Sequence, residues 1–331
     1  MRILIASASY ELYLAKCHEA LRTGLRRLFD TRCFGKGYPG YRPFLRSYDQ
    51  VIRRTFGEAP DVLLADSYFP HDKTGFRYSG FGSLDCLKGF VLGDYWDVTE
   101  SSDPREFVEF VVGNRADFIL SYFLQPLDFF AGSAIADRFV YCPPCFDPAI
   151  FNDWQQPKVH DVGFLASGTV DYSDWYPERH AIHKLLLQRR DLRYLWADHP
   201  GWQLRKKQHP FVGSNFSKAI NSCKIFVTTG GRLRNAQPKI FEALASRTLL
   251  MTDDVVGADA LGLKDGVNCV KVSQSDIMDK IDHYLRHAEE RESIAETGYL
   301  HAMRHHSCYV RALSVGEALM TRLPRKIADL V

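Results

Sequence analysis

Residues 238–254 read Pro238-Lys-Ile-Phe-Glu-Ala-Leu-Ala-Ser-Arg-Thr-Leu-Leu-Met-Thr-Asp-Asp254. Pro238 suits the first turn of a helix, where its missing N–H costs nothing. Ile240, Phe241 and Leu244 follow at helical spacing and form an apolar stripe. The next residues, 248–252, are mostly apolar and predict a buried strand. The segment therefore predicts a helix that leads directly into a strand of a parallel sheet.

Two charged residues of this helix, Lys239 and Glu242, lie about one turn apart, and we expect them to share one exposed edge. The first helical turn favours a phosphate through its unpaired N–H groups and its dipole, and Lys239 adds a positive charge. The Glu242 carboxylate can accept hydrogen bonds from ribose hydroxyls. An ordinary amphipathic helix with a surface ion pair is the alternative interpretation.

The preceding residues favour a ligand site. Lys224-Ile-Phe-Val-Thr-Thr229 predicts a buried strand, and Gly230-Gly231-Arg232 begins a glycine-containing loop. Glycines let the backbone approach a ligand closely, and open α/β sheets bind ligands beyond the carboxyl ends of their strands. Neither a G-x-x-x-x-G-K-[ST] motif nor a G-x-G-x-x-G after the first strand occurs, which disfavours P-loop proteins and Rossmann dehydrogenases.

Along the whole chain, short apolar runs alternate with longer amphipathic segments, which predicts parallel sheets. The expected strands are residues 3–6, 61–65, 90–92, 118–120, 139–142, 161–165, 193–197, 225–228, 248–252 and 267–272. The expected helices include residues 12–29, 176–189, 216–222, 275–297 and 309–322. The connector around residues 152–158 separates two similar sets of elements, so we predict two domains with one sheet each.

Several segments together resemble group-1 glycosyltransferases, with the spore-maturation-protein-like branch as the most similar pattern. The resemblance rests on Lys239–Asp254, Gly266–Val270, Glu290–Gly298 and His305–Arg311, and more loosely on Val140–Phe151, Asp161–Ser167 and Tyr176–Arg179. It implies a GT-B fold, in which two Rossmann-like domains face a central cleft and the C-terminal helix crosses back to the first domain. The expected bounds are 1–152 for the acceptor-side domain, 153–308 for the nucleotide-sugar domain and 309–331 for the returning helix.

The resemblance also implies a function, namely metal-independent transfer of a sugar, with retention, from a nucleoside-diphosphate sugar to a hydroxyl-bearing acceptor. A hexosyltransferase is expected. The donor site would contain Lys239, Glu242, Gly230, Gly231, Arg232, Arg179 and Ser167, without a metal or a separate cofactor. Lys239, Arg179 and Arg232 would neutralise the leaving diphosphate. Many group-1 enzymes carry a Glu-x7-Glu pair, but Arg234 stands here in place of the first glutamate.

The acceptor side is predicted from Gly93-Asp94-Tyr95-Trp96-Asp97, which follows a buried strand. The two aromatic rings can bound a sugar, while Asp94 or Asp97 orients the acceptor hydroxyl. Alternatively, Asp97 caps the helix that begins near Asp103. The acceptor class stays open among glycans, natural products, proteins and nucleobases.

Composition fits a soluble enzyme. The formal net charge of +2 is too small for a dedicated nucleic-acid binder, and residues 1–6 resemble a first strand more than a signal peptide. We therefore expect a cytoplasmic monomer or homodimer without a membrane span. Cys142-Pro-Pro-Cys145 predicts a stiff connector rather than a metal site. His180 with His183, and His301 with His305, are expected on solvated helix faces.

Three other functions remain open at this stage. A nucleotide-sugar 2-epimerase would share the phosphate and ribose sites but would need acid and base groups around the sugar. A glucosyltransferase acting on DNA bases would bind DNA in a salt-dependent way. A catalytically silent nucleotide-binding protein would bind the donor without consuming it.

Overall fold

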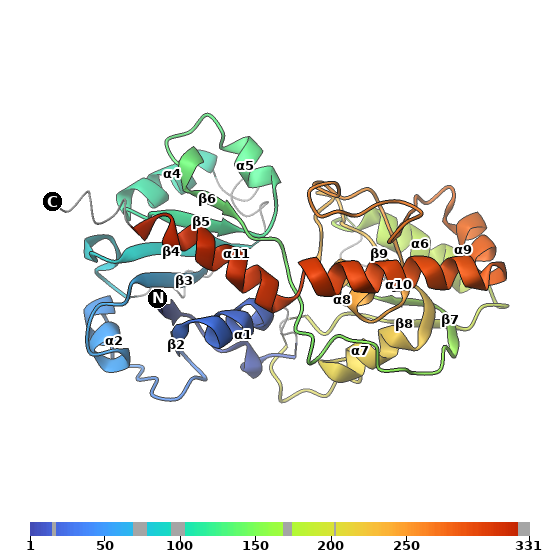
Figure 1. Ribbon diagram of the computed structural model, residues 1–331, viewed down its shortest axis with the longest axis horizontal. Coiled ribbons are helices and arrows are strands. Elements are labelled where there is room, and N and C mark those ends of the chain that lie inside the picture. The colour runs from blue at the N-terminus through green and yellow to red at the C-terminus, as the bar shows by residue number, and fades with distance from the viewer. Residues whose placement is uncertain (15–17, 69–77, 94–102, 168–173, 202, 324–331) are drawn as a thin grey trace. The chain divides into compact units, whose positions relative to one another are not determined.

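The computed structural model describes residues 1–14, 18–68, 78–93, 103–167, 174–201 and 203–323. They form two compact units (Figure 1). Unit 1 contains Met1–Glu11, Leu21–Pro143 and Arg311–Val331, and unit 2 contains Leu12–Ala20 and Pro144–Val310. The main change of unit falls inside the Cys142-Pro-Pro-Cys145 motif, so this motif connects the two units. The bounds 1–152, 153–308 and 309–331 stay a prediction.

Unit 1 is built on a parallel six-stranded sheet with the order β2-β1-β3-β4-β5-β6. Its strands are β1 Arg2–Ala6, β2 Asp30–Phe34, β3 Val62–Tyr68, β4 Leu87–Leu92, β5 Phe118–Ser121 and β6 Phe139–Tyr141. All six residues of β4 are buried, as expected for a central strand with helices on both faces.

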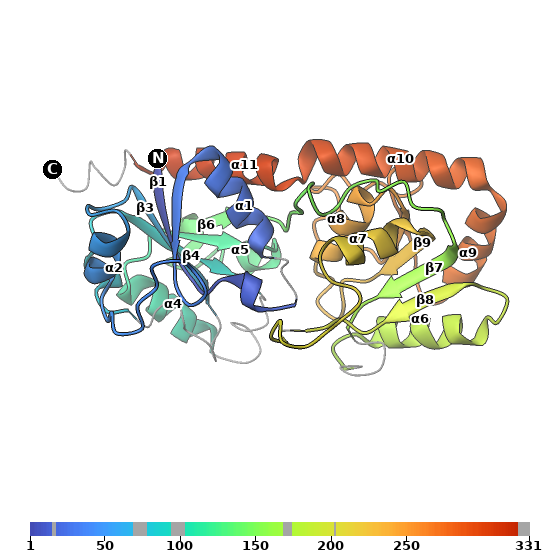
Figure 2. The same ribbon diagram turned by 90° about the horizontal axis from the view of Figure 1, so that it is seen from below.

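The α-helices of unit 1 lie on both faces of this sheet. They are α1 Glu19–Leu28, α2 Tyr48–Thr55, α4 Pro104–Gly113, α5 Gln125–Phe129 and α11 Cys308–Met320, which enters unit 1 at Arg311. Figure 2 shows α1 and α11 on one face and α2 and α4 on the other. The turns η1 Tyr10–Leu12, η3 Phe81–Ser83 and η4 Ala136–Arg138 are 3-10 helices. The Asp103 side chain caps α4 by accepting from the backbone N–H of Arg105. The N-cap of this helix is therefore Asp103, and the alternative prediction that Asp97 caps it is wrong.

The helix predicted over residues 12–29 is too long at its N-terminal end. It begins only at Glu19, and Leu12 to Leu14 instead lie antiparallel to Gln203–Arg205. Leu14 N–H donates to the Gln203 carbonyl at 2.9 Å, and Arg205 N–H donates to the Leu12 carbonyl at 2.9 Å. Backbone pairing with a segment far along the chain thus replaces the first turns of the predicted helix.

Unit 2 is built on a parallel five-stranded sheet with the order β11-β10-β9-β7-β8. Its strands are β7 His160–Leu165, β8 Tyr194–Ala197, β9 Cys223–Thr228, β10 Leu249–Thr252 and β11 Val270–Lys271. Its helices are α6 Pro177–Gln188, α7 Ser214–Asn221, α8 Pro238–Ala245, α9 Ile277–Arg286 and α10 Ala288–His305. Figure 2 shows α7 and α8 on one face of the sheet and α6 on the other. The two parallel-sheet α/β domains predicted from the sequence are therefore confirmed.

Two predicted elements of unit 2 differ from the structure. The strand predicted over residues 267–272 is reduced to β11, because residues 264–269 form a turn in which Gly266 N–H donates to the Cys269 carbonyl at 2.9 Å. The single helix predicted over residues 275–297 is broken into α9 and α10 at His287, whose ψ of 74° is not helical. Residues 286–293 contain neither glycine nor proline, so no helix-breaking residue reveals the break.

The strand order places a topological switch point in unit 2. The connection from β7 leads to β8 on one side, and the next strand, β9, lies on the other side of β7. The segments that leave β7 and β9 therefore diverge, and such a divergence opens a crevice beyond the carboxyl ends of the two strands. Ser167 follows β7, and Thr229 with Gly230 follows β9.

Within the described part of the chain, no helix combines the length and the apolar character that crossing a membrane requires. The cytoplasmic location stays a prediction.

Candidate functional site

Arg179 joins the two strand ends at the switch point. Its side chain donates to the Ser167 carbonyl at 3.0 Å and to the Thr229 carbonyl at 2.5 Å, and its guanidinium lies 3.9 Å from the centre of the Tyr176 ring. The residue is 3% exposed, and burial lowers its pKa from the ordinary value. The sequence predicts Arg179 at the donor site, where it would help to neutralise the leaving diphosphate, and this stays a prediction. In the structure its guanidinium donates to backbone carbonyls that follow β7 and β9, so it holds these two strand ends together and adds a positive charge there.

The loop after β9 is folded on itself and against Tyr176. Gly231 has a φ of 73°, and a Cβ atom placed there would lie 2.7 Å from the Tyr176 ring, so only glycine fits. Arg232 N–H donates to the Trp175 carbonyl at 2.9 Å, and Asn235 N–H donates to the Gly230 carbonyl at 3.1 Å.

The N–H of Gly230 is also occupied, because it donates to Asp253 Oδ1 at 2.8 Å. The expectation that Gly230 and Gly231 belong to the donor site stays a prediction. The structure shows that these glycines allow the loop to pack tightly on itself and against Tyr176.

Two arginines of the loop differ in what they contact. The Arg232 guanidinium lies 4.2 Å from the centre of the Trp175 ring, and its residue is exposed. Arg234 donates to Asp254 Oδ2 at 2.6 Å. Asp254 also pairs with Lys271 at 2.7 Å. The charge of Arg234 is therefore shared with a carboxylate, and the loop is less cationic than its sequence indicates.

Helix α8 carries the two charged residues from which the sequence argument started. Its residues from Ile240 to Ala245 are all buried, including Glu242, which is 7% exposed. The expectation that Lys239 and Glu242 share an exposed edge is therefore wrong for Glu242, and no salt bridge joins the two side chains among the described residues. Lys239 is half-buried. Helix α10 covers α8, since a Cβ atom at Gly298 would lie 2.8 Å from the Leu244 side chain.

The Glu242 carboxylate is the chemically unusual group of the site. Burial raises its pKa to about 7, although the positive charge of Lys239 acts in the opposite direction. Among the described residues, no side-chain hydrogen bond or ion pair holds this carboxylate, and only the charge of Lys239 acts on it. A buried polar group without a partner is costly, so such a group commonly has a ligand or a catalytic task.

The structure also brings two residues to this edge that the sequence analysis missed. Asp253 follows β10, accepts from Gly230 N–H, and has its pKa raised by burial. His199 follows β8, and its Nδ1 accepts from Gly201 N–H at 3.0 Å. Burial, together with the charges of Lys239 and Arg179, holds the pKa of His199 well below its usual range, so the ring is neutral. Asp253 directly follows β10, and His199 is the second residue after β8. Because ligands bind beyond the carboxyl ends of parallel strands, a search of the residues that follow each predicted strand would have found both.

The remaining predicted residues give a mixed result. Asp94 and Asp97 lie outside the described residues, so their role stays a prediction. His183 is buried and its Nδ1 lies 2.8 Å from the Tyr194 hydroxyl, so the prediction of a solvated face is wrong there. Cys142 and Cys145 are buried free thiols, and burial raises the pKa of Cys142 to about 11.

Comparisons with known proteins bear on the segment that carries this site. Residues 179–315 match a sequence family described as "Glycosyl transferase-like". These residues include Arg179, the loop after β9, α8 and Asp253. No curated protein matches the chain.

Solved structures resemble the whole chain. HepE from Anabaena, in complex with UDP-glucose, matches with a TM-score of 0.62 and 12% identity over 97% of this chain and 100% of its own. Sucrose-phosphate synthase from Thermosynechococcus elongatus matches with a TM-score of 0.58 and 10% identity over 100% of both chains. A glycosyltransferase from Rickettsia africae matches with a TM-score of 0.56 and 11% identity over 97% and 98%. Residues 179–315 thus carry the sequence pattern of a glycosyltransferase family, and the chain as a whole has the two-sheet α/β fold of GT-B glycosyltransferases.

Proposed function

We propose that the protein transfers a sugar, a hexose, from a nucleoside-diphosphate sugar to a hydroxyl-bearing acceptor, and that unit 2 binds the donor. The family match covers the candidate site, and the structurally similar HepE binds UDP-glucose. The observation that carries the proposal is the Glu242 carboxylate, which is buried on α8, the helix after β9, and lacks a partner among the described residues.

A ribose diol would satisfy this carboxylate. Two adjacent hydroxyl groups can donate to its two oxygens, and hydrogen bonds to an ionised acceptor are shorter and stronger than neutral ones. Binding would therefore favour the ionised form of Glu242, although burial disfavours that form in the free protein. The nucleotide would remove the cost of a buried, unpaired charge, and this gain would add to its affinity.

The diphosphate would lie near Lys239 and the N-terminal end of α8. Lys239 is the second residue of this helix, where the helix dipole favours an anion. Arg232 adds a further cation, held over the Trp175 ring, and Arg179 contributes its charge while it fixes Ser167 and Thr229. These charges would stabilise the diphosphate as the glycosidic bond breaks, which is the step in which negative charge develops on the leaving group.

The proposed chemistry needs no metal ion at the donor site, since cationic side chains supply the positive charge. The sequence contains no Asp-x-Asp motif, with which many metal-dependent glycosyltransferases hold their ion. In a retaining reaction the donor phosphate can accept the acceptor proton. Asp94 or Asp97 would then only orient the acceptor hydroxyl.

The proposal is tested by measuring binding of UDP, GDP, ADP and their glucose conjugates by thermal shift and then by calorimetry. At about 100 times its dissociation constant, a true donor should stabilise the protein by about 2.7 kcal/mol. Lys239→Ala and Glu242→Ala should each weaken binding at least about tenfold, because each removes a charge-assisted contact.

Lys184→Ala and Glu289→Gln are matched controls, since both residues are exposed on helices of unit 2, and their affinity should equal that of the parent. Incubation with donor alone and with candidate acceptors then separates transfer from epimerisation and from silent binding. Unchanged donor affinity in both site variants would refute the assignment of α8.

A further inference from the structure

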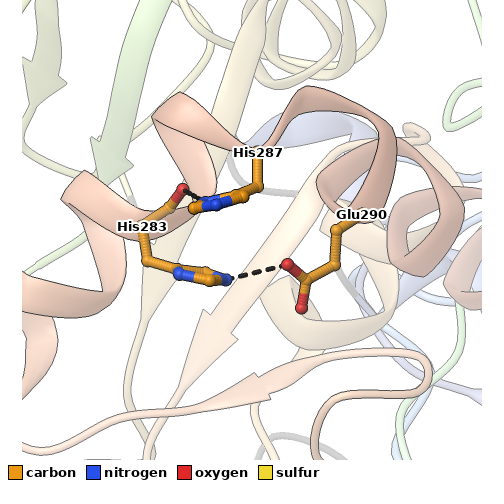
Figure 3. A group of neighbouring side chains, drawn as sticks. All are labelled: His283, His287 and Glu290. Carbon is orange, nitrogen blue, oxygen red and sulfur yellow. Dashed lines mark hydrogen bonds and ion pairs between the residues drawn. The ribbon is translucent and has the colours of Figure 1, made fainter.

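The corner between α9 and α10 gathers two histidines and a glutamate, away from the strand ends described above. His283 lies in the last turn of α9, His287 joins the two helices, and Glu290 lies in the first turn of α10. Figure 3 shows the three side chains side by side. One ligand atom from each residue lies within 4.8 Å of the others, and the described residues contain no second group of this kind.

We propose that His283, His287 and Glu290 bind a divalent transition-metal ion, with Zn²⁺ as the best-matched ion. Two imidazoles and one carboxylate form a donor set that zinc accepts, and histidines four residues apart can bind one ion together. Zinc bonds of about 2.1 Å at tetrahedral angles place ligand atoms about 3.4 Å apart. The three side chains therefore need only small side-chain rotations to reach this geometry.

The hydrogen bonding of His287 fits a metal ligand. Its Nδ1 lies 2.7 Å from the His283 carbonyl oxygen, and because a carbonyl only accepts, Nδ1 carries the hydrogen. In the neutral ring Nε2 then has a free lone pair. Histidines that bind metals generally donate their other N–H to a backbone carbonyl or carboxylate in this manner.

His283 and Glu290 already face each other. His283 Nε2 lies 2.8 Å from Glu290 Oε2, and the two side chains are 44% and 48% exposed, so a hydrated ion can reach them. An ion that binds between these atoms replaces the hydrogen on Nε2. A neutral ring then carries its hydrogen on Nδ1 and releases no proton, whereas a protonated ring releases one proton to solvent. The ring centres of His283 and His287 lie 4.1 Å apart in a stacked arrangement, and this stacking holds the two imidazoles close together.

The consequence of binding would be structural. The break in the helix at His287 leaves α9 and α10 joined by a single residue, and an ion held by both helices would fix the angle between them. Anything that binds the folded state alone stabilises it. The site contains none of the residues assigned to the donor, so this proposal does not depend on the proposed function.

The test uses tag-free protein that has been treated with chelator and transferred to metal-free buffer. Calorimetric titration with ZnCl₂ should show one ion per chain, and repeating it in buffers of different ionisation enthalpy measures the protons released. His287→Ala and Glu290→Gln should each lower zinc affinity at least about tenfold. The exposed His305 of α10 supplies the control His305→Ala, which should bind zinc as the parent does.

Thermal unfolding with and without zinc completes the test. The parent and the His305→Ala variant should be stabilised by zinc, and the His287→Ala variant should lose that stabilisation. Among the described residues, the His287 side chain makes only its hydrogen bond to the His283 carbonyl and its ring stacking on His283, so the alanine variant should fold normally. Zinc affinities that agree within about threefold among the parent, His287→Ala and Glu290→Gln would overturn the proposal.

Discussion

Replacing Glu242 with glutamine should stabilise the ligand-free protein at alkaline pH and leave its stability unchanged in acid. Burial raises the pKa of Glu242 from its usual 4.5 to about 7, so the folded protein keeps a proton that the unfolded chain has already lost. Between these values the folded state binds more protons than the unfolded state, and stability falls as pH rises. The cost is absent below the unfolded pKa and complete above the folded one.

The size of the effect follows from the same two values. A rise of the pKa from 4.5 to about 7 corresponds to about 3 kcal/mol, at about 1.4 kcal/mol for each pH unit. Glutamine has nearly the same shape and no charge, so Glu242→Gln should gain up to about 3 kcal/mol at about pH 8 and nothing at about pH 4. The same variant should bind the nucleotide more weakly at about pH 8, because an ionised acceptor makes stronger hydrogen bonds than a neutral one.

Urea unfolding across this pH range measures the predicted difference. All tryptophans except Trp96 belong to the sequence of unit 2, so their fluorescence reports mainly on the unit that contains Glu242. Glu289→Gln removes an exposed carboxylate of α10 and should follow the parent at every pH. If Glu242→Gln also follows the parent at every pH, then Glu242 is ionised in the folded protein at neutral pH and the argument from its burial fails.

Three further predictions concern the metal, the acceptor side and the glycine loop. Incubation with EDTA should leave sugar transfer unchanged, whereas activity that is lost and then restored by Mg²⁺ or Mn²⁺ would show that the donor needs a metal. Asp94→Asn and Asp97→Asn should lower the transfer rate at least about tenfold while donor affinity, measured by calorimetry, stays nearly constant; parent rates in both variants would remove these residues from the mechanism. Gly231→Ala should lose more stability in urea than Gly57→Ala, by at least about 1 kcal/mol. Both glycines have positive φ, but only Gly231 has a ring 2.7 Å from the added Cβ, so equal losses would mean that the Tyr176 contact is unimportant.

Local patterns in the sequence were sufficient to predict much of the fold. Residues 161–165 and 225–228 are short, mainly apolar runs. Such a run by itself predicts a strand that is buried on both faces of a parallel sheet, and both strands are buried in this way. The sequence from Lys224 to Asp254 likewise predicts strand, glycine loop, helix and strand in the order that the structure shows. Since ligands bind beyond the carboxyl ends of parallel strands, this order also located the candidate site.

The same local patterns failed where a distant segment decides the environment. Residues 12–14 have helical spacing, yet they pair with residues 203–205, and this partner lies far along the chain. The break at His287 escaped prediction because residues 286–293 contain neither glycine nor proline, so no helix-breaking residue marks it.

By itself, then, the sequence determined the succession of strands and helices, the two sheets and the place of the site, because these depend on residue type and on spacing over a few turns. Only the tertiary structure decided the state of the side chains at that site. Glu242 has an elevated pKa because the folded chain buries its carboxylate, and Arg179 donates to two carbonyls because β7 and β9 end side by side. Burial and pairing depend on which distant elements meet, and the spacing of residues within one helix does not encode that.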